Sequence, residues 1–314
     1  MIIKIILVIL IILIASTIYH QVRKKIEFKQ NPPPGEMIKI GEDKMHIYGK
    51  GEGDLTIVFT SGGSGFTYGH FYEAFNELAK ENRVVAYDRP GYGWSESTSR
   101  PRTLEQINKD LYELLDKSGE TGPYVLVGHS IGGTEVLQFA QRYPELVAGV
   151  VMLDAGSVNY HKQEPPLSWS TNIIRFSRFT GILRFETYVM DKLKPSILEG
   201  SLPKSEEVRD LSMMMFYNRL CNRNALEEIK QLPKNKELGK NLGDIPLLLL
   251  TASESEPKHH DIERDELFME DQKSLLEWST NSKQKMVEGS HMFLLYEPEI
   301  VIEELLDFLD NMVE

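Results

Sequence analysis

A serine set between glycines is the feature of the sequence with the clearest chemical potential. Residues 124–133 read YVLVGHSIGG, so an apolar run leads into Gly128, Ser130 and Gly132 in the pattern G-x-S-x-G. Glycines here permit a strand-to-helix turn that is too tight for side chains, and such a turn lifts a serine hydroxyl above the sheet edge. The backbone N–H of Ile131 would then point to where an oxyanion forms. The pattern therefore predicts Ser130 as a nucleophile.

A serine hydroxyl is a poor nucleophile until a base removes its proton. In strand–turn–helix arrangements of this kind, the base is a histidine late in the chain, after the last strand. His291 lies in the run GSHMF, directly before the segment expected to form the final helix. The chain has 8 histidines, and His291 alone has this position. His129 flanks the nucleophile, where its side chain would point into the fold, and we interpret it as structural.

A second oxyanion donor is expected in the loop after an earlier strand. Residues 61–65 read SGGSG and directly follow the apolar run LTIVFT, so this loop offers several unhindered N–H groups. We predict Gly63 as the donor, with Ser64 as the neighbour that could replace it.

Four stretches of the chain resemble the α/β-hydrolase superfamily, in particular its esterase and proline-iminopeptidase-like branch. They read PPG (33–35), VVAYDRPGYGWS (84–95), GPYVLVGHSIGG (122–133) and GSH (289–291), and the match covers roughly residues 33–314. The resemblance implies an α/β-hydrolase fold and a Ser-His-acid triad without a cofactor. It also implies a structural role for Asp88 and Arg89, which would brace the loop behind the active site.

The third member of the triad is where the sequence departs from the family pattern. The resemblance puts an aspartate in the loop after residues 245–251, but this loop reads ASESEP and Ser255 takes the expected position. Glu254 or Glu256 could substitute after a small loop shift. A second arrangement in the superfamily has the acid one strand earlier, where Asp154 ends the run AGVVMLD. Asp154 is our first choice, with Glu254 and Glu256 left open; the acid would hold the imidazole tautomer and stabilise the imidazolium.

Alternating strand-like and helix-like segments predict the sheet that must position these residues. Such alternation favours a mostly parallel sheet with helices on both faces. The rhythm breaks between residues 157 and 242, which we interpret as an inserted helical cap, so the core would comprise residues 37–156 and 243–314. The strand-like runs are 37–40, 44–48, 55–60, 83–87, 124–127, 148–153, 245–251 and 285–288, and the helix-like runs are 71–79, 103–117, 132–143 and 299–312.

The first 25 residues predict a membrane anchor. Residues 5–19 carry no charge, and with Lys4 reaching the interface the apolar segment extends to about 18 residues, enough for a bilayer core. Residues 23–25 read RKK and would lie at the headgroups. A cleaved secretory signal is the alternative, but the run AST is a poor cleavage site. The side of the membrane stays open, and residues 26–36 are predicted to form a Pro-rich tether.

Charge and cysteine content exclude several other classes. The 314-residue chain has 47 acidic and 35 basic side chains, a formal charge of −12, which argues against a nucleic-acid partner. A single cysteine, Cys221, excludes an internal disulfide framework and a cysteine-based zinc site. The run His259-His260-Asp261 lacks further ligands at a recognisable spacing, so no metal is expected.

These residues together predict a serine hydrolase that cleaves a small-molecule ester, or an amide, through an acyl-enzyme. Apolar stretches in the cap, such as residues 213–217, suit a substrate with an acyl chain. Two alternatives stay open. One is an aminopeptidase like the proline iminopeptidases, with Glu206 and Glu207 as candidate cap acids, and the other is a non-catalytic ligand-binding protein on the same fold.

Overall fold

One sheet of 8 strands, in the order β1-β2-β4-β3-β5-β6-β7-β8, forms the centre of the domain. The computed structural model describes residues 1–63, 65–163, 167–193, 202–236, 238–239, 241–253 and 262–313. The β1–β2 and β2–β4 pairs are antiparallel and all other pairs are parallel. The strands are β1 (Glu36–Ile40), β2 (Asp43–Lys50), β3 (Thr56–Thr60), β4 (Arg83–Tyr87), β5 (Tyr124–His129), β6 (Val147–Leu153), β7 (Leu247–Ala252) and β8 (Ser282–Val287).

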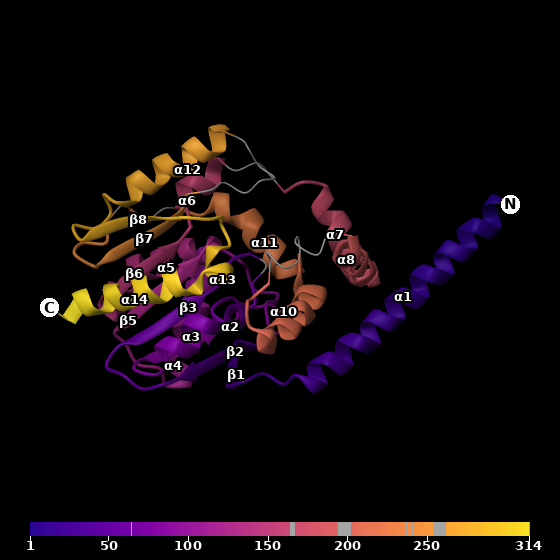
Figure 1. Cartoon of the computed structure of the whole chain (residues 1–314), viewed down its shortest axis with the longest axis horizontal. Helices are drawn as coiled ribbons and strands as arrows, with labels where there is room; N and C mark the ends of the chain where they lie inside the picture. Colours follow the sequence, from indigo (N-terminus) through magenta and orange to yellow (C-terminus); the bar gives the residue numbers. More distant parts are fainter. Residues whose placement is uncertain are drawn as a thin grey trace.

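Helices cover both faces of this sheet (Figure 1). Leu126 of β5 belongs to a buried cluster with side chains of α4 and α5, whereas Val125 and Val127 belong to a second cluster with α3, α13 and α14. Because both faces are buried, the parallel strands read as continuous apolar runs instead of alternating ones. The helices of the core are α2 (Thr67–His70), α3 (Tyr72–Leu78), α4 (Leu104–Ser118), α5 (Ile131–Arg142), α12 (Ile262–Leu275), α13 (Phe293–Tyr296) and α14 (Pro298–Val313).

The segment between β6 and β7 is helical where the structure describes it, as the interrupted strand rhythm predicts. Its residues 213–217 do not form the free apolar surface that the sequence suggested, because Met214 and Met215 are buried against Phe66 and Trp94. The helices of this cap are α6 (Val158–Gln163), α7 (Ser170–Thr180), α8 (Ile182–Leu193), α10 (Glu206–Arg219) and α11 (Arg223–Gln231).

The amino-terminal helix α1 (Ile2–Gln30) is longer than predicted. It runs through the first five residues of the segment 26–36, so the tether prediction was wrong for residues 26–30. Glu27 explains the extension, because its carboxylate accepts hydrogen bonds at 2.9 and 2.6 Å from the Arg184 guanidinium of the cap. The Pro-rich residues that follow are bound to the core as well. Trp94 Nε1 donates to the Asn31 carbonyl at 3.0 Å, and His46 Nε2 lies 2.6 Å from the Pro34 carbonyl.

The predicted fold class is confirmed, with differences at the ends of elements. The predicted helix 71–79 corresponds to α3, the short helix α2 before it was not predicted, and β8 begins at Ser282, three residues earlier than predicted. Helix α12 was not predicted. Its run IERDELFMEDQKSL carries charges on most sides and lacks a clear apolar stripe.

A substitution at Gly133, in the first turn of α5, tests how closely this helix packs against Ala155, which follows β6. A Cβ at Gly133 would lie 2.2 Å from the Ala155 Cβ, so we expect Gly133→Ala to lower the free energy of unfolding by about 3 kcal/mol despite alanine's better helix propensity. Urea denaturation measures this change. Gly119→Ala is the control, because Gly119 has φ 75° but no atom within 4 Å of an added Cβ, and it should lose only about 1 kcal/mol. Equal losses would contradict the packing argument.

Candidate active site

Ser130 occupies a strained turn between β5 and α5. Its backbone has φ 55° and ψ −130°, a conformation that residues other than glycine rarely adopt. Its N–H donates to the Leu153 carbonyl at 3.1 Å. Glycine is required on both sides of Ser130, because neighbouring backbone atoms come too close to leave room for a Cβ. A Cβ at Gly128 would lie 2.4 Å from the Gly132 carbonyl oxygen, and one at Gly132 would lie 2.6 Å from the Ser61 carbonyl oxygen. The turn therefore holds Ser130 at the carboxyl end of β5.

The structure brings His291 and Asp154 together at the same edge of the sheet. His291 Nδ1 lies 2.6 Å from Asp154 Oδ2, a distance at which the ring N–H donates to the carboxylate. The other oxygen, Oδ1, accepts from the backbone N–H of Ala252 at 2.9 Å. With one oxygen held by the end of β7, the carboxylate has a fixed direction toward the imidazole. This contact fixes the His291 tautomer, with the ring proton on Nδ1.

Asp154 follows β6 with φ 45°, so it shares with Ser130 a positive φ at a strand end. Its own N–H donates to the Leu250 carbonyl at 2.7 Å, which ties the strained residue to the neighbouring strand. The alternative acids Glu254 and Glu256 lie outside the described residues. Of the three candidate acids, Asp154 is the one within the described residues, and it contacts His291.

His129 supports the position of His291. It is almost fully buried, and its Nε2 lies 2.9 Å from the His291 carbonyl oxygen, so this nitrogen carries the proton and donates. The two rings are tilted with centroids 4.5 Å apart. Burial lowers the pKa of His129 well below its ordinary value, and burial likewise lowers the pKa of nearby His70 to about 4. Both rings are therefore neutral near pH 7 and bring no positive charge next to His291.

The predicted oxyanion loop lies against the turn. A Cβ on Gly62 would be 3.0 Å from the Ser130 Cβ, and one on Gly63 would be 3.3 Å from the Ile131 Cδ1. Ile131 begins α5, and the N–H groups of a first helical turn have no acceptor within the helix. The loop and the helix start are thus adjacent, as the prediction of Gly63 and Ile131 requires. Ser64 lies outside the described residues.

A buried arginine holds that loop from behind. The Arg89 guanidinium donates to the carbonyl oxygens of Ser61 and Gly62 at 2.8 and 2.9 Å, and it also pairs with Glu135 of α5 at 2.9 Å and Glu228 of α11 at 3.1 Å. One cation therefore connects the predicted oxyanion loop, helix α5 after Ser130 and the cap.

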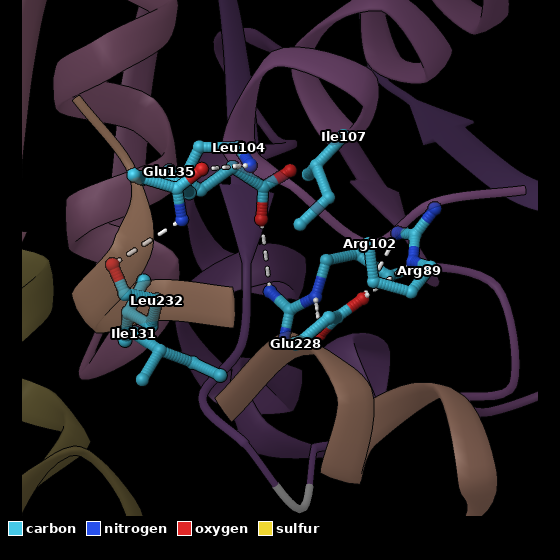
Figure 2. A pocket seen from close by; sticks show the side chains of 9 residues that line it. Arg89, Arg102, Leu104, Ile107, Ile131, Glu135, Glu228 and Leu232 are labelled. Carbon is cyan, nitrogen blue, oxygen red and sulfur yellow. Dashed lines mark hydrogen bonds and ion pairs between the residues drawn. The ribbon is translucent and has the colours of Figure 1, made fainter. Parts of the chain in front are cut away.

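Glu228 extends this network to a second arginine. Figure 2 shows its carboxylate with Arg89 and Arg102 beside a small cavity, and Arg102 pairs with it at 2.9 Å. The cavity has a volume of about 10 Å³, the size of one water molecule, so it is no substrate site. The sequence analysis missed Glu135 and Glu228. A usable signal was present in Glu135, the one charged residue in the helix before Arg142, at the start of the helix directly after the turn.

Asp88 has the structural role that the resemblance implied. Its carboxylate lies 2.8 Å from His46 Nδ1 and accepts from the backbone N–H groups of Thr67 and Trp94, both at 3.1 Å. Burial alone would raise the pKa of the Asp88 carboxyl, but these hydrogen bonds hold it below its ordinary value. The residue thus ties the DRPG loop to β2 and α2.

No group of three or more potential metal ligands occurs within the part of the chain that the structure describes. The run His259-His260-Asp261 lies outside that part.

Comparison with known proteins identifies the family of this fold. The sequence model described as alpha/beta hydrolase fold matches residues 56–298, more than half of the chain. The chain belongs to the α/β-hydrolase fold family. The site described above occupies the carboxyl edge of this α/β hydrolase's sheet.

Individual relatives agree with this family. The uncharacterized protein YbdG of Bacillus subtilis (strain 168) is 24% identical over 308 residues, covering 96% of this chain and 93% of YbdG. The 2-hydroxy-6-oxo-2,4-heptadienoate hydrolase of Pseudomonas putida is 30% identical over 135 residues, 41% of this chain and 48% of that enzyme. Among solved structures, a thermophilic esterase from Thermogutta terrifontis superposes with a TM-score of 0.62 at 20% identity, covering 89% and 97% of the two chains. These similarities support a hydrolase-type enzyme.

The Arg89 network predicts a large loss of stability on truncation. Arg89→Met would leave Glu135 and Glu228 buried without this partner, so the free energy of unfolding should fall by about 3–5 kcal/mol in urea denaturation. Arg83→Met removes an ion pair to Glu120 in which the arginine is partly exposed, and it should lose only about 1 kcal/mol or less. Similar losses for the two variants would show that the buried network is not a main source of stability.

The neutral histidines predict a pH dependence of stability. The folded-state pKa values of His129 and His70 lie below the unfolded value of about 6.5. Below that pH the unfolded chain therefore binds protons that the folded chain does not, so stability should be highest above pH 6.5 and should fall on acidification toward pH 5. Melting temperatures of the full chain in detergent over this range measure the slope. His129→Gln, which can still donate an N–H, should flatten it; an unchanged slope would contradict the assignment to His129.

Proposed function

We propose that this α/β hydrolase is a serine hydrolase that cleaves carboxylic esters, held at a membrane by α1. The observation that carries the proposal is the 2.6 Å contact between His291 Nδ1 and Asp154 Oδ2, at the strand edge that also carries Ser130 in its strained turn. A serine, a histidine and a carboxylate in this order suit acyl transfer.

In the proposed reaction, Ser130 Oγ attacks the ester carbonyl carbon while His291 Nε2 accepts the hydroxyl proton. The carbonyl oxygen becomes an oxyanion, and the N–H groups of Gly63 and Ile131 donate to it. Collapse of this intermediate breaks the bond to the alcohol oxygen, which takes the proton from His291 and leaves an acyl-Ser130 ester. Asp154 stabilises the imidazolium and remains ionised throughout.

Water then completes the cycle. His291 Nε2 takes a proton from a water molecule, whose oxygen attacks the acyl carbon through the same oxyanion site. The Ser130 oxygen leaves and regains the proton from His291, and the carboxylic acid product departs. Atoms and charges balance without a cofactor. Epoxide hydrolases of this fold use an aspartate as nucleophile, and Ser130 therefore favours ester over epoxide chemistry.

The membrane part of the proposal rests on α1. Among the described residues, Ile2–Gln30 is the one helix long and apolar enough to cross a bilayer; its most apolar 18-residue window has a mean hydropathy of 2.8 and none of it is buried in the protein. A cleaved signal has the same composition, but the run AST is a poor cleavage site and the apolar stretch is long for a signal. We propose an uncleaved anchor on this ground.

Covalent labelling tests the proposed nucleophile. The full chain in detergent should react with a fluorophosphonate probe, because the probe requires an activated serine, and Ser130→Ala should not react. Asp154→Asn should slow labelling by about 10³–10⁴-fold, since the imidazole would lose its anionic partner. Glu254→Gln is the matched control and should label like the parent.

Two results would contradict parts of this proposal. If the folded parent protein never reacts with the probe, the serine-hydrolase proposal is contradicted and the non-catalytic ligand-binding alternative is favoured. Slow labelling in Glu254→Gln but not in Asp154→Asn would leave the serine mechanism intact and move the acid to Glu254.

A further inference from the structure

Helices α7 and α8 are in contact, and they expose apolar side chains and bury small polar ones, the reverse of the pattern expected of helices in water. We call the pair, with Gly181 between them, the cap hairpin. Phe179 and Phe185 are 59% and 67% exposed, whereas the small polar residues Ser177 and Thr180 are only 4% and 5% exposed. A helix on a water-soluble surface normally buries its apolar residues and exposes its polar ones. Trp169, Ile173 and Phe176 add to the exposed apolar face of this region.

The buried hydroxyls of the cap hairpin are satisfied within it. Thr180 Oγ1 donates to the Phe176 carbonyl at 2.9 Å, and Thr187 Oγ1 donates to the Leu183 carbonyl at 2.9 Å. These bonds to the carbonyl four residues back allow hydroxyl side chains to pack between helices without water. The inner face is therefore stable, and the outer aromatic face has no covering element within the part of the chain that the structure describes.

The cap hairpin lies directly against the proposed anchor. Figure 1 shows α7 and α8 beside the middle of α1, and a Cβ at Gly181 would lie 2.6 Å from the His20 Cβ and 3.0 Å from the Ser16 carbonyl oxygen. Arg184 of α8 pairs with Glu27, which lies about two turns beyond His20 along α1. Ser16 and His20 mark the end of the apolar run of α1, which is where the membrane–water boundary would fall.

We infer that the cap hairpin is a second membrane-contacting element, whose aromatic face enters the lipid leaflet next to α1. This inference rests on the membrane anchor of the proposed function. Phenylalanine and tryptophan side chains are typical of helices that lie about 5–10 Å deep in the interface. Two charged side chains of the hairpin, Arg175 and Glu186, are exposed, and at this depth they reach the headgroups. The partner is thus a phospholipid surface.

The position of the cap gives this contact a functional meaning. Ser130, Asp154 and His291 lie at the carboxyl edge of the sheet, and the cap is inserted directly after β6 at that edge. Contact of the cap hairpin with lipid therefore turns the catalytic edge toward the bilayer. The arrangement favours esters dissolved in the membrane, because such substrates could reach the site directly from the lipid without first crossing water.

Fluorescence quenching in vesicles tests the inference on the full chain. Single cysteines at Phe179 and Phe185, in a Cys221→Ser background, are labelled with an environment-sensitive dye in vesicles of phosphatidylcholine and phosphatidylglycerol. Both positions are exposed, so the substitutions should not disturb packing. Ile9→Cys in α1 reports the anchor, and Lys109→Cys on α4 is an exposed control away from α1. Lipids with a nitroxide on the acyl chain should quench the hairpin dyes and the Ile9 dye about threefold more than the Lys109 dye, because the nitroxide reaches only groups below the headgroups.

Other outcomes overturn the inference in distinguishable ways. Quenching at Ile9 alone, with Phe179 and Phe185 behaving like Lys109, would leave the anchor standing and remove the hairpin from the bilayer. No quenching at any position would remove both. Hairpin dyes protected from the nitroxide lipids and also from aqueous iodide would show that another copy of the chain covers the aromatic face.

Discussion

The buried Arg89 guanidinium is the interaction on which the site most depends. A planar cation can donate in several fixed directions at once, and here it reaches backbone carbonyls of the oxyanion loop together with carboxylates of α5 and α11. Burying a guanidinium costs desolvation free energy, so stability alone does not explain why an arginine occupies this position. What the arginine provides is a fixed distance between the glycine-rich loop after β3 and the helix that begins after Ser130. A glycine loop with so much backbone freedom needs this external brace.

Two residues of the site, Ser130 and Asp154, have a strained backbone at the ends of neighbouring strands. Ser130 and Asp154 both have positive φ, and each is held by a hydrogen bond from its own N–H to a neighbouring strand end, Leu153 for Ser130 and Leu250 for Asp154. The sheet thus over-determines both residues, which is the condition for strained backbone to persist. Their side chains leave the strands in directions that a regular strand would not allow. Asp154 then reaches His291 Nδ1 at 2.6 Å.

Local sequence was enough to place Ser130 at a strand-to-helix turn and His291 between the last strand and α13, because both are short patterns with a direct geometric meaning. Asp154 was recognisable as a strand-end carboxylate and was the first choice of acid. Local sequence could not choose it over Glu254 and Glu256, because its contact with His291 depends on how distant segments meet. Glu228 was out of reach for a different reason: it lies 139 residues from Arg89, and nothing local marks it. The length of α1 was misjudged because the Pro-rich run suggested a free tether, whereas a tertiary ion pair at Glu27 extends the helix.

The contacts between α1 and the cap limit where the domain can move relative to α1. Glu27 binds Arg184 twice and also accepts from Asn218 at 3.0 Å, while the Arg219 guanidinium lies 5.0 Å from the Phe28 ring centroid. These contacts fix the orientation of α1 relative to the domain. With α1 as the proposed membrane anchor, the domain would keep one tilt and one height above the lipid. The proposed hydrolase would then act on substrates that diffuse within its own membrane, and the surface of a facing membrane would be out of its reach.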